Sequence, residues 1–156
     1  MGGIALAGVV GTACDGGSSE DLSRSAQVYV ATIREVVGQQ PPLEEPDALA
    51  VVYVMPVGET TIGADVQAEV VGELRDDADV RFADERAEAV EEDGEGEPVR
   101  DGGVLVAVGE LTPEGDPVVM EVEVYRSELD WSKTLLTFAE RSSQWTVTSS
   151  SVLPTS

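Results

Sequence analysis

The chain has 156 residues, with 31 acidic against 9 basic side chains and a formal net charge of −22. A field of this sign repels nucleic acids and anionic lipid headgroups, so we expect no nucleic-acid partner. Histidine is absent and cysteine occurs once. That excludes Ser-His-Asp and Cys-His catalysis, His-based zinc sites and an internal disulfide. The acidic, lysine-poor composition fits a salt-rich habitat or a GC-rich genome equally well.

The chain starts with an uncharged run of small and apolar residues that stops at its only cysteine. Residues 3–13 are the apolar part, Thr12 and Ala13 are small, and Cys14 follows. A secretory signal has an apolar run of about 7–15 residues and small residues before the cleavage site. This run is too short to cross a bilayer, which takes about 20 apolar residues. We interpret residues 1–13 as a signal-peptide-like leader.

The leader resembles the lipobox of small exported lipoproteins of bacteria and archaea, which ends in a small residue followed by cysteine. The resemblance implies that the sulfur of Cys14 accepts a diacylglycerol and that residues 14–19 are the lipidated cysteine and a flexible tether. Two or three acyl chains make a durable anchor, at about 0.8 kcal/mol per buried CH₂. Two features depart from the family. Gly11 replaces its usual aliphatic residue, and no Lys or Arg precedes the apolar run. We interpret the second as a start codon assigned too late or as loss of the first leader residues.

The remaining residues, 20–156, are expected to form one domain that begins with a helix. In residues 18–38 apolar positions repeat at spacings of four and three, which predicts a helix with one buried stripe. Ser18 or Ser19 is the expected N-cap. Residues 39–47 hold three prolines and are predicted to be an extended linker.

Shorter elements follow the linker. Residues 48–55 read as a strand buried on both faces, because the run has little polarity. Residues 60–74 are predicted to be a second helix, residues 80–83 a short strand, and residues 84–90 one or two helical turns. The acidic, glycine-broken segment 91–98 is expected to be a mobile loop.

After that loop the hydrophobic period changes to two, which predicts four strands joined by short turns. Short links between neighbouring strands favour an antiparallel meander. The first of these strands is apolar on both faces, so we expect it to be central in the sheet. The four strands are expected at residues 104–111, 118–125, 132–140 and 145–153.

This order of elements predicts an α+β fold, with N-terminal helices packed on one face of a curved antiparallel sheet that ends in the four-strand meander. The order is similar to that of NTF2-like and cystatin-like folds. A concave sheet covered by helices often leaves a pocket at its open end. We therefore take Tyr53, Tyr125 and Trp145 as candidate lining residues.

No cofactor is expected, and no residue stands out as catalytic. The acidic residues 93–97 offer oxygens of the kind Ca²⁺ prefers, but their spacing does not fit an EF-hand loop, so we predict a solvated loop and no metal site. The sequence thus predicts a lipid-anchored extracytoplasmic protein, held to the membrane through Cys14, whose acidic domain binds an unknown protein or small molecule. The alternatives are an NTF2-like carrier or enzyme and a cytosolic acidic accessory protein.

Overall fold

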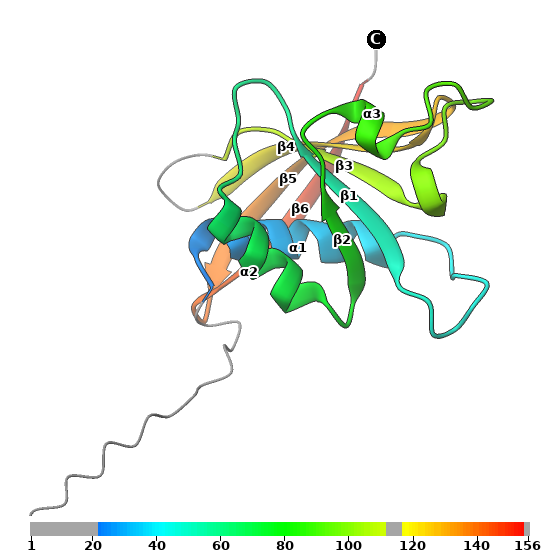
Figure 1. The fold of residues 1–156 in the computed structure, drawn as a ribbon. Helices are drawn as coiled ribbons and strands as arrows, with labels where there is room; N and C mark the ends of the chain where they lie inside the picture. The colour runs from blue at the N-terminus through cyan, green and yellow to red at the C-terminus, as the bar shows by residue number, and fades with distance from the viewer. Residues whose placement is uncertain (1–21, 112–116, 155–156) are drawn as a thin grey trace, which may run out of the picture.

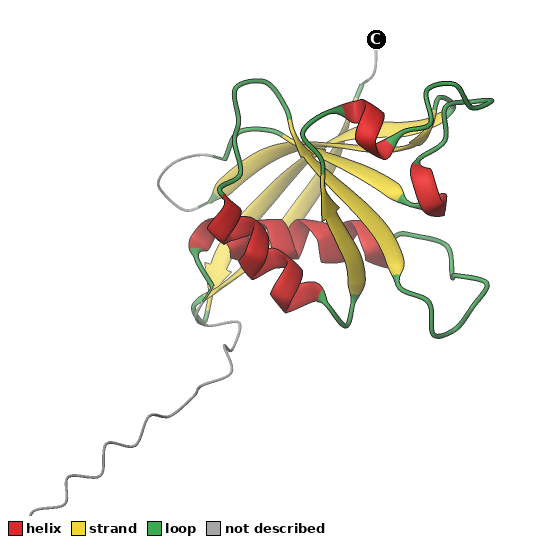
Figure 2. Cartoon of the chain, viewed as in Figure 1, coloured by secondary structure: helices red, strands yellow, loops and turns green. Residues whose placement is uncertain are grey.

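A computed structural model describes residues 22–111 and 117–154, so Cys14 and the leader lie outside the described residues. The described residues form a six-stranded sheet flanked by helices (Figures 1 and 2). None of the helices described is long and apolar enough to span a membrane. The helices are α1 (Arg24–Gly38), α2 (Ala64–Leu74), α3 (Arg86–Ala89) and the 3₁₀ turn η2 (Arg100–Gly102). The strands are β1 (Ala50–Pro56), β2 (Ala78–Phe82), β3 (Val104–Val108), β4 (Val118–Ser127), β5 (Asp130–Arg141) and β6 (Gln144–Leu153).

The strand order is β2-β1-β3-β4-β5-β6, which confirms an α+β fold and the antiparallel meander from β3 to β6. The prediction of an antiparallel sheet is wrong for the N-terminal half, because β1 runs parallel to both β2 and β3. The reason is the connection: α2 carries the chain back along the sheet before β2 begins, so β2 starts at the same end as β1.

The main core lies between the sheet and the pair α1 and α2. The sheet curves around α1 (Figure 1), and Phe138, Met120 and Val106 are almost fully buried beneath it. The part of the predicted stripe that lies in α1, Ala26, Tyr29, Ile33 and Val36, is buried, but so are Val28 and Thr32 beside it. The helix is enclosed because α2 and β6 flank it. Thr32 satisfies its hydroxyl by donating to the carbonyl of Val28 at 2.8 Å.

A smaller core lies on the opposite face of the sheet. There Tyr53, Leu105 and Tyr125 pack against the crossover from β2 to β3, which includes α3. α3 is therefore separated from α1 and α2 by the sheet. All five residues of β3 are buried, which confirms that this strand is central.

The start of α1 differs from the prediction. The helix begins at Arg24 and its N-cap is Ser23, whereas the predicted caps Ser18 and Ser19 lie outside the described residues. The side chain of Ser23 accepts a hydrogen bond from the Ala26 N–H at 3.3 Å. Glu69 of α2 in turn accepts from the backbone N–H and the hydroxyl of Ser23, at 2.9 and 2.7 Å. This contact between the two helices is absent from any local sequence pattern.

The acidic segment 91–98 folds back on itself between the bridged residues Val90 and Val99. Its backbone is tied to the turn between β4 and β5, since the Glu128 N–H donates to the Gly96 carbonyl at 2.9 Å. The segment is a loop, as its composition predicted, and it carries hydrogen bonds that composition alone did not predict.

The turn between β5 and β6 carries local strain that a substitution should relieve. Ser142 and Ser143 both have positive φ, at 51° and 63°. Side chains disfavour this left-handed region, and glycine does not. We expect Ser143→Gly to raise the free energy of unfolding by about 1 kcal/mol. Urea denaturation would measure the change. Ser150→Gly, in extended β6, is the matched control and should lower stability. Equal effects at both positions would contradict the argument.

Candidate functional site

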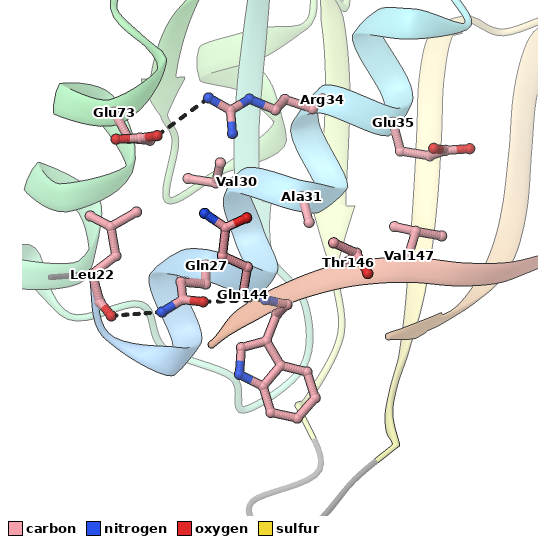
Figure 3. A pocket seen from close by; sticks show the side chains of 11 residues that line it. Leu22, Gln27, Val30, Ala31, Arg34, Glu35, Glu73, Gln144, Thr146 and Val147 are labelled. Atoms are coloured by element: carbon pink, nitrogen blue, oxygen red, sulfur yellow. Dashed lines mark hydrogen bonds and ion pairs between the residues drawn. The ribbon is translucent and has the colours of Figure 1, made fainter. Parts of the chain in front are cut away.

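The strongest candidate site is a groove of about 330 Å³ between α1, β6 and the edge of α2. Ligand pockets in proteins start at roughly this size. Its floor is apolar and its rim carries amide and charged side chains (Figure 3). It is lined by Leu22, Gln27, Val30, Ala31, Arg34, Glu35, Glu73, Gln144, Trp145, Thr146 and Val147.

Helical spacing explains the α1 side of the groove. Gln27, Ala31 and Arg34 recur every three or four residues, so they share one side of the helix. Gln27 fixes one end of the groove. The side-chain amide N–H of Gln27 donates to the Leu22 carbonyl at 3.0 Å, and its amide oxygen accepts from the backbone N–H of Trp145 at 3.2 Å. One side chain thereby links the start of α1 to β6.

The opposite wall carries ion pairs from Arg34 of α1 to Glu73 of α2 and to Asp77, which follows α2. Arg34 lies 3.0 Å from Asp77 and 3.4 Å from Glu73, and Figure 3 shows it reaching from α1 toward Glu73. The Arg34 side chain is 49% exposed. Exposed pairs of this kind contribute about 0–1 kcal/mol, so the pair positions the rim more than it stabilises the fold.

The structure does not bring the three predicted pocket residues together. Trp145 lines the groove on the α1 face and is 9% exposed, with the Arg24 guanidinium 5.0 Å from its ring centroid. Tyr53 and Tyr125 lie on the opposite face, in the smaller core. Successive strand residues point to opposite faces, so the face of each aromatic depends on its register position and not on its residue type.

Both tyrosines contact the crossover from β2 to β3. Arg86 covers the Tyr125 ring at 3.9 Å, and the Tyr125 hydroxyl donates to the Glu97 carbonyl at 2.9 Å. Arg81 lies 5.6 Å from the centroid of the Tyr53 ring and donates to its hydroxyl at 3.1 Å. Tyr125 is 4% exposed and Tyr53 is 7% exposed, so both are core residues, each covered by an arginine side chain.

Arg81 is the centre of a small charged network on this face. It pairs with Asp79 at 2.7 Å and with Asp101 at 2.6 Å. The Tyr53 hydroxyl lies 3.2 Å from the Asp101 carboxylate. Hydrogen bonds from Arg81 and then from Tyr53 hold the pKa of Asp101 below its ordinary 3.8. Asp101 has a φ of 57°, so the network also holds a strained turn.

The groove is suited to binding, because its lining pairs an apolar floor with amide donors and acceptors. In the part of the chain that the structure describes, no group of three or more Asp, Glu, Cys or His side chains is arranged to hold a metal ion. The sequence offered no signal for Gln27 and Gln144, because isolated glutamines fit any surface.

No family model, no curated protein and no solved structure matches the chain. The expected likeness to NTF2-like and cystatin-like folds is therefore not confirmed by the comparison with solved structures.

The Asp101 network predicts a pH dependence. Because folding lowers the pKa of Asp101, its ion pair contributes stability above the ordinary pKa of 3.8, and that contribution is lost as the pH falls through the lowered value. We expect Asp101→Asn to be less stable than the parent at neutral pH, with the gap closing below about pH 4. Thermal unfolding from about pH 2.5 to 7 would measure it. Asp76→Asn removes the same charge from an exposed position and is the control for net charge. A gap independent of pH would contradict the assignment.

Proposed function

We propose that this protein is a lipid-anchored extracytoplasmic protein whose acidic α+β domain binds a ligand or partner. The observation that carries the proposal is the uncharged leader that ends at the single cysteine, Cys14. Thioether-linked acyl chains would hold the chain at the membrane, and residues 15–19 would act as a short polar spacer. Like-charge repulsion from anionic headgroups would keep the acidic domain off the lipid surface.

The groove supports the binding part of the proposal. Leu22 lines it only three residues after the tether ends at residue 19. An anchored domain would then present the groove near its point of attachment. The apolar floor at Val30 and Ala31 suits an apolar group, and the amides of Gln27 and Gln144 suit a polar one.

An NTF2-like carrier or enzyme has less support, because it needs an enclosed pocket inside the curved sheet, and there the described interior is filled by apolar side chains such as Ile33 and Phe138. A cytosolic accessory protein with Cys14 inside the fold stays an alternative, since Cys14 lies outside the described residues.

The anchor predicts a change in partitioning. We expect Cys14→Ala to move the protein from the membrane fraction to the soluble fraction, because the acyl chains can no longer be attached. The measurement is fractionation of native-host cells that express the gene from its own locus, followed by intact-mass analysis. Thr12→Ala keeps a small residue before the cysteine and should leave partitioning unchanged. A Cys14→Ala protein that stays membrane-bound, or a parent without an acyl adduct, would overturn the anchor.

The groove predicts binding of a neutral apolar dye. Nile red should bind the protein with enhanced emission, and Ala31→Phe should weaken binding about tenfold or more by filling the floor. Val71→Phe, on the exposed side of α2, adds a comparable ring elsewhere and should leave binding unchanged. Emission that is equal in the parent and in Ala31→Phe would show that the groove is not the binding surface.

A further inference from the structure

The two edges of the sheet differ in how they are protected. Among the described residues, β2 and β6 each pair with one strand only. β2 has five residues and carries the ion pair of Asp79 and Arg81. β6 has ten residues and carries no charge at all. Proteins commonly shield exposed edges with charges, prolines or short strands, because an edge offers unpaired N–H and C=O groups to another strand. β6 has none of these shields between Gln144 and Leu153.

The absence of charge at this edge stands out against the composition of the chain. Residues 142–156 form the longest run without a charged side chain. The segment 130–156 holds two acids and two bases, so its net side-chain charge is zero, and the whole −22 arises from residues 1–129. The charged residues of the segment are Asp130, Lys133, Glu140 and Arg141.

The edge is also accessible and suited to strand pairing. Residues 148–152 are exposed, and Val152 is 71% exposed. Threonine and valine, which favour extended backbone, alternate at the start of β6. A bulge disturbs the ladder opposite Thr137 and Phe138, while the register from Ser149 to Leu153 is regular. The regular and exposed portion of β6 is therefore the part available to a new strand.

We propose that β6 pairs antiparallel with β6 of a second copy of this chain, joining two sheets across a two-fold axis. Identical strands in antiparallel pairing satisfy two-fold symmetry, so one edge serves both partners. Two molecules that each carry −22 repel each other, and the neutral β5–β6 hairpin is the approach on which that repulsion is smallest. A basic or apolar partner would not require this edge to be neutral, whereas a second acidic copy does.

The proposal fixes how the association responds to salt. Pairing one strand buries less area than a stable dimer interface, so the dimer should be weak. Salt screens the repulsion between the acidic domains and leaves strand pairing intact. We therefore expect the dissociation constant to fall as ionic strength rises, the opposite of an interface held by ion pairs.

Sedimentation equilibrium of the full chain tests this, with Cys14→Ala as the background so that no disulfide links two copies. Measurements span about 10 µM to 1 mM protein and about 0.05 to 1 M NaCl. We expect a monomer–dimer equilibrium that strengthens with salt. The double variant Ser150→Lys, Val152→Lys should raise the dissociation constant about tenfold or more, because like charges then face each other across the new strand pair.

The matched control is Thr61→Lys, Val71→Lys, which adds the same two charges at exposed positions away from β6. It should dimerise at least as well as the parent, since it lowers the net negative charge equally. Circular dichroism confirms that each variant is folded. A parent that stays monomeric throughout, a dimer that the β6 variant does not weaken, or equal weakening in the control would each overturn the proposal.

Discussion

The structure depends on the enclosure of α1. The curved sheet covers one side of the helix, and α2 and β6 cover the flanks, so residues beyond a single stripe are buried. Burying each large aliphatic side chain contributes about 1.5–3 kcal/mol, and most of the main core touches this helix or the strands beneath it. The groove is a consequence of the same arrangement, since it lies where the outer side of α1 meets β6.

The opposite face of the sheet is stabilised differently. There a long crossover, with few apolar residues of its own, covers Tyr53, Leu105 and Tyr125. Arginine side chains also lie over the tyrosine rings. The chain has many carboxylates with which these arginines can pair. A guanidinium on a ring buries apolar surface while its donors remain free for acids. Acidic side chains thus contribute to the fold through their pairing with these arginines, as well as to the charge of the surface.

Charge is unevenly distributed along the chain, and this links the two proposals. A strongly acidic body keeps the domain away from anionic lipid and from its own copies. The neutral hairpin of β5 and β6 departs from that pattern at both the groove and the sheet edge, because β6 contributes to each. Both proposals therefore concern β6 and the side of α1 beside it. The acidic loop at 91–98 is held by its hydrogen bonds with Glu128 and Tyr125.

The sequence by itself determined the local elements: the helical stripe of α1, the hydrophobic period of two in β4, and the two-faced apolar β3 at the centre. Only the tertiary structure decided that β1 runs parallel to both neighbours, that Ser23 caps α1 through Glu69, and that Trp145 faces away from Tyr53 and Tyr125. Gln27 and Trp145 meet across 118 residues of sequence. The physical reason is that periodicity records which side of an element is apolar, whereas the element that covers that side is chosen by long-range packing.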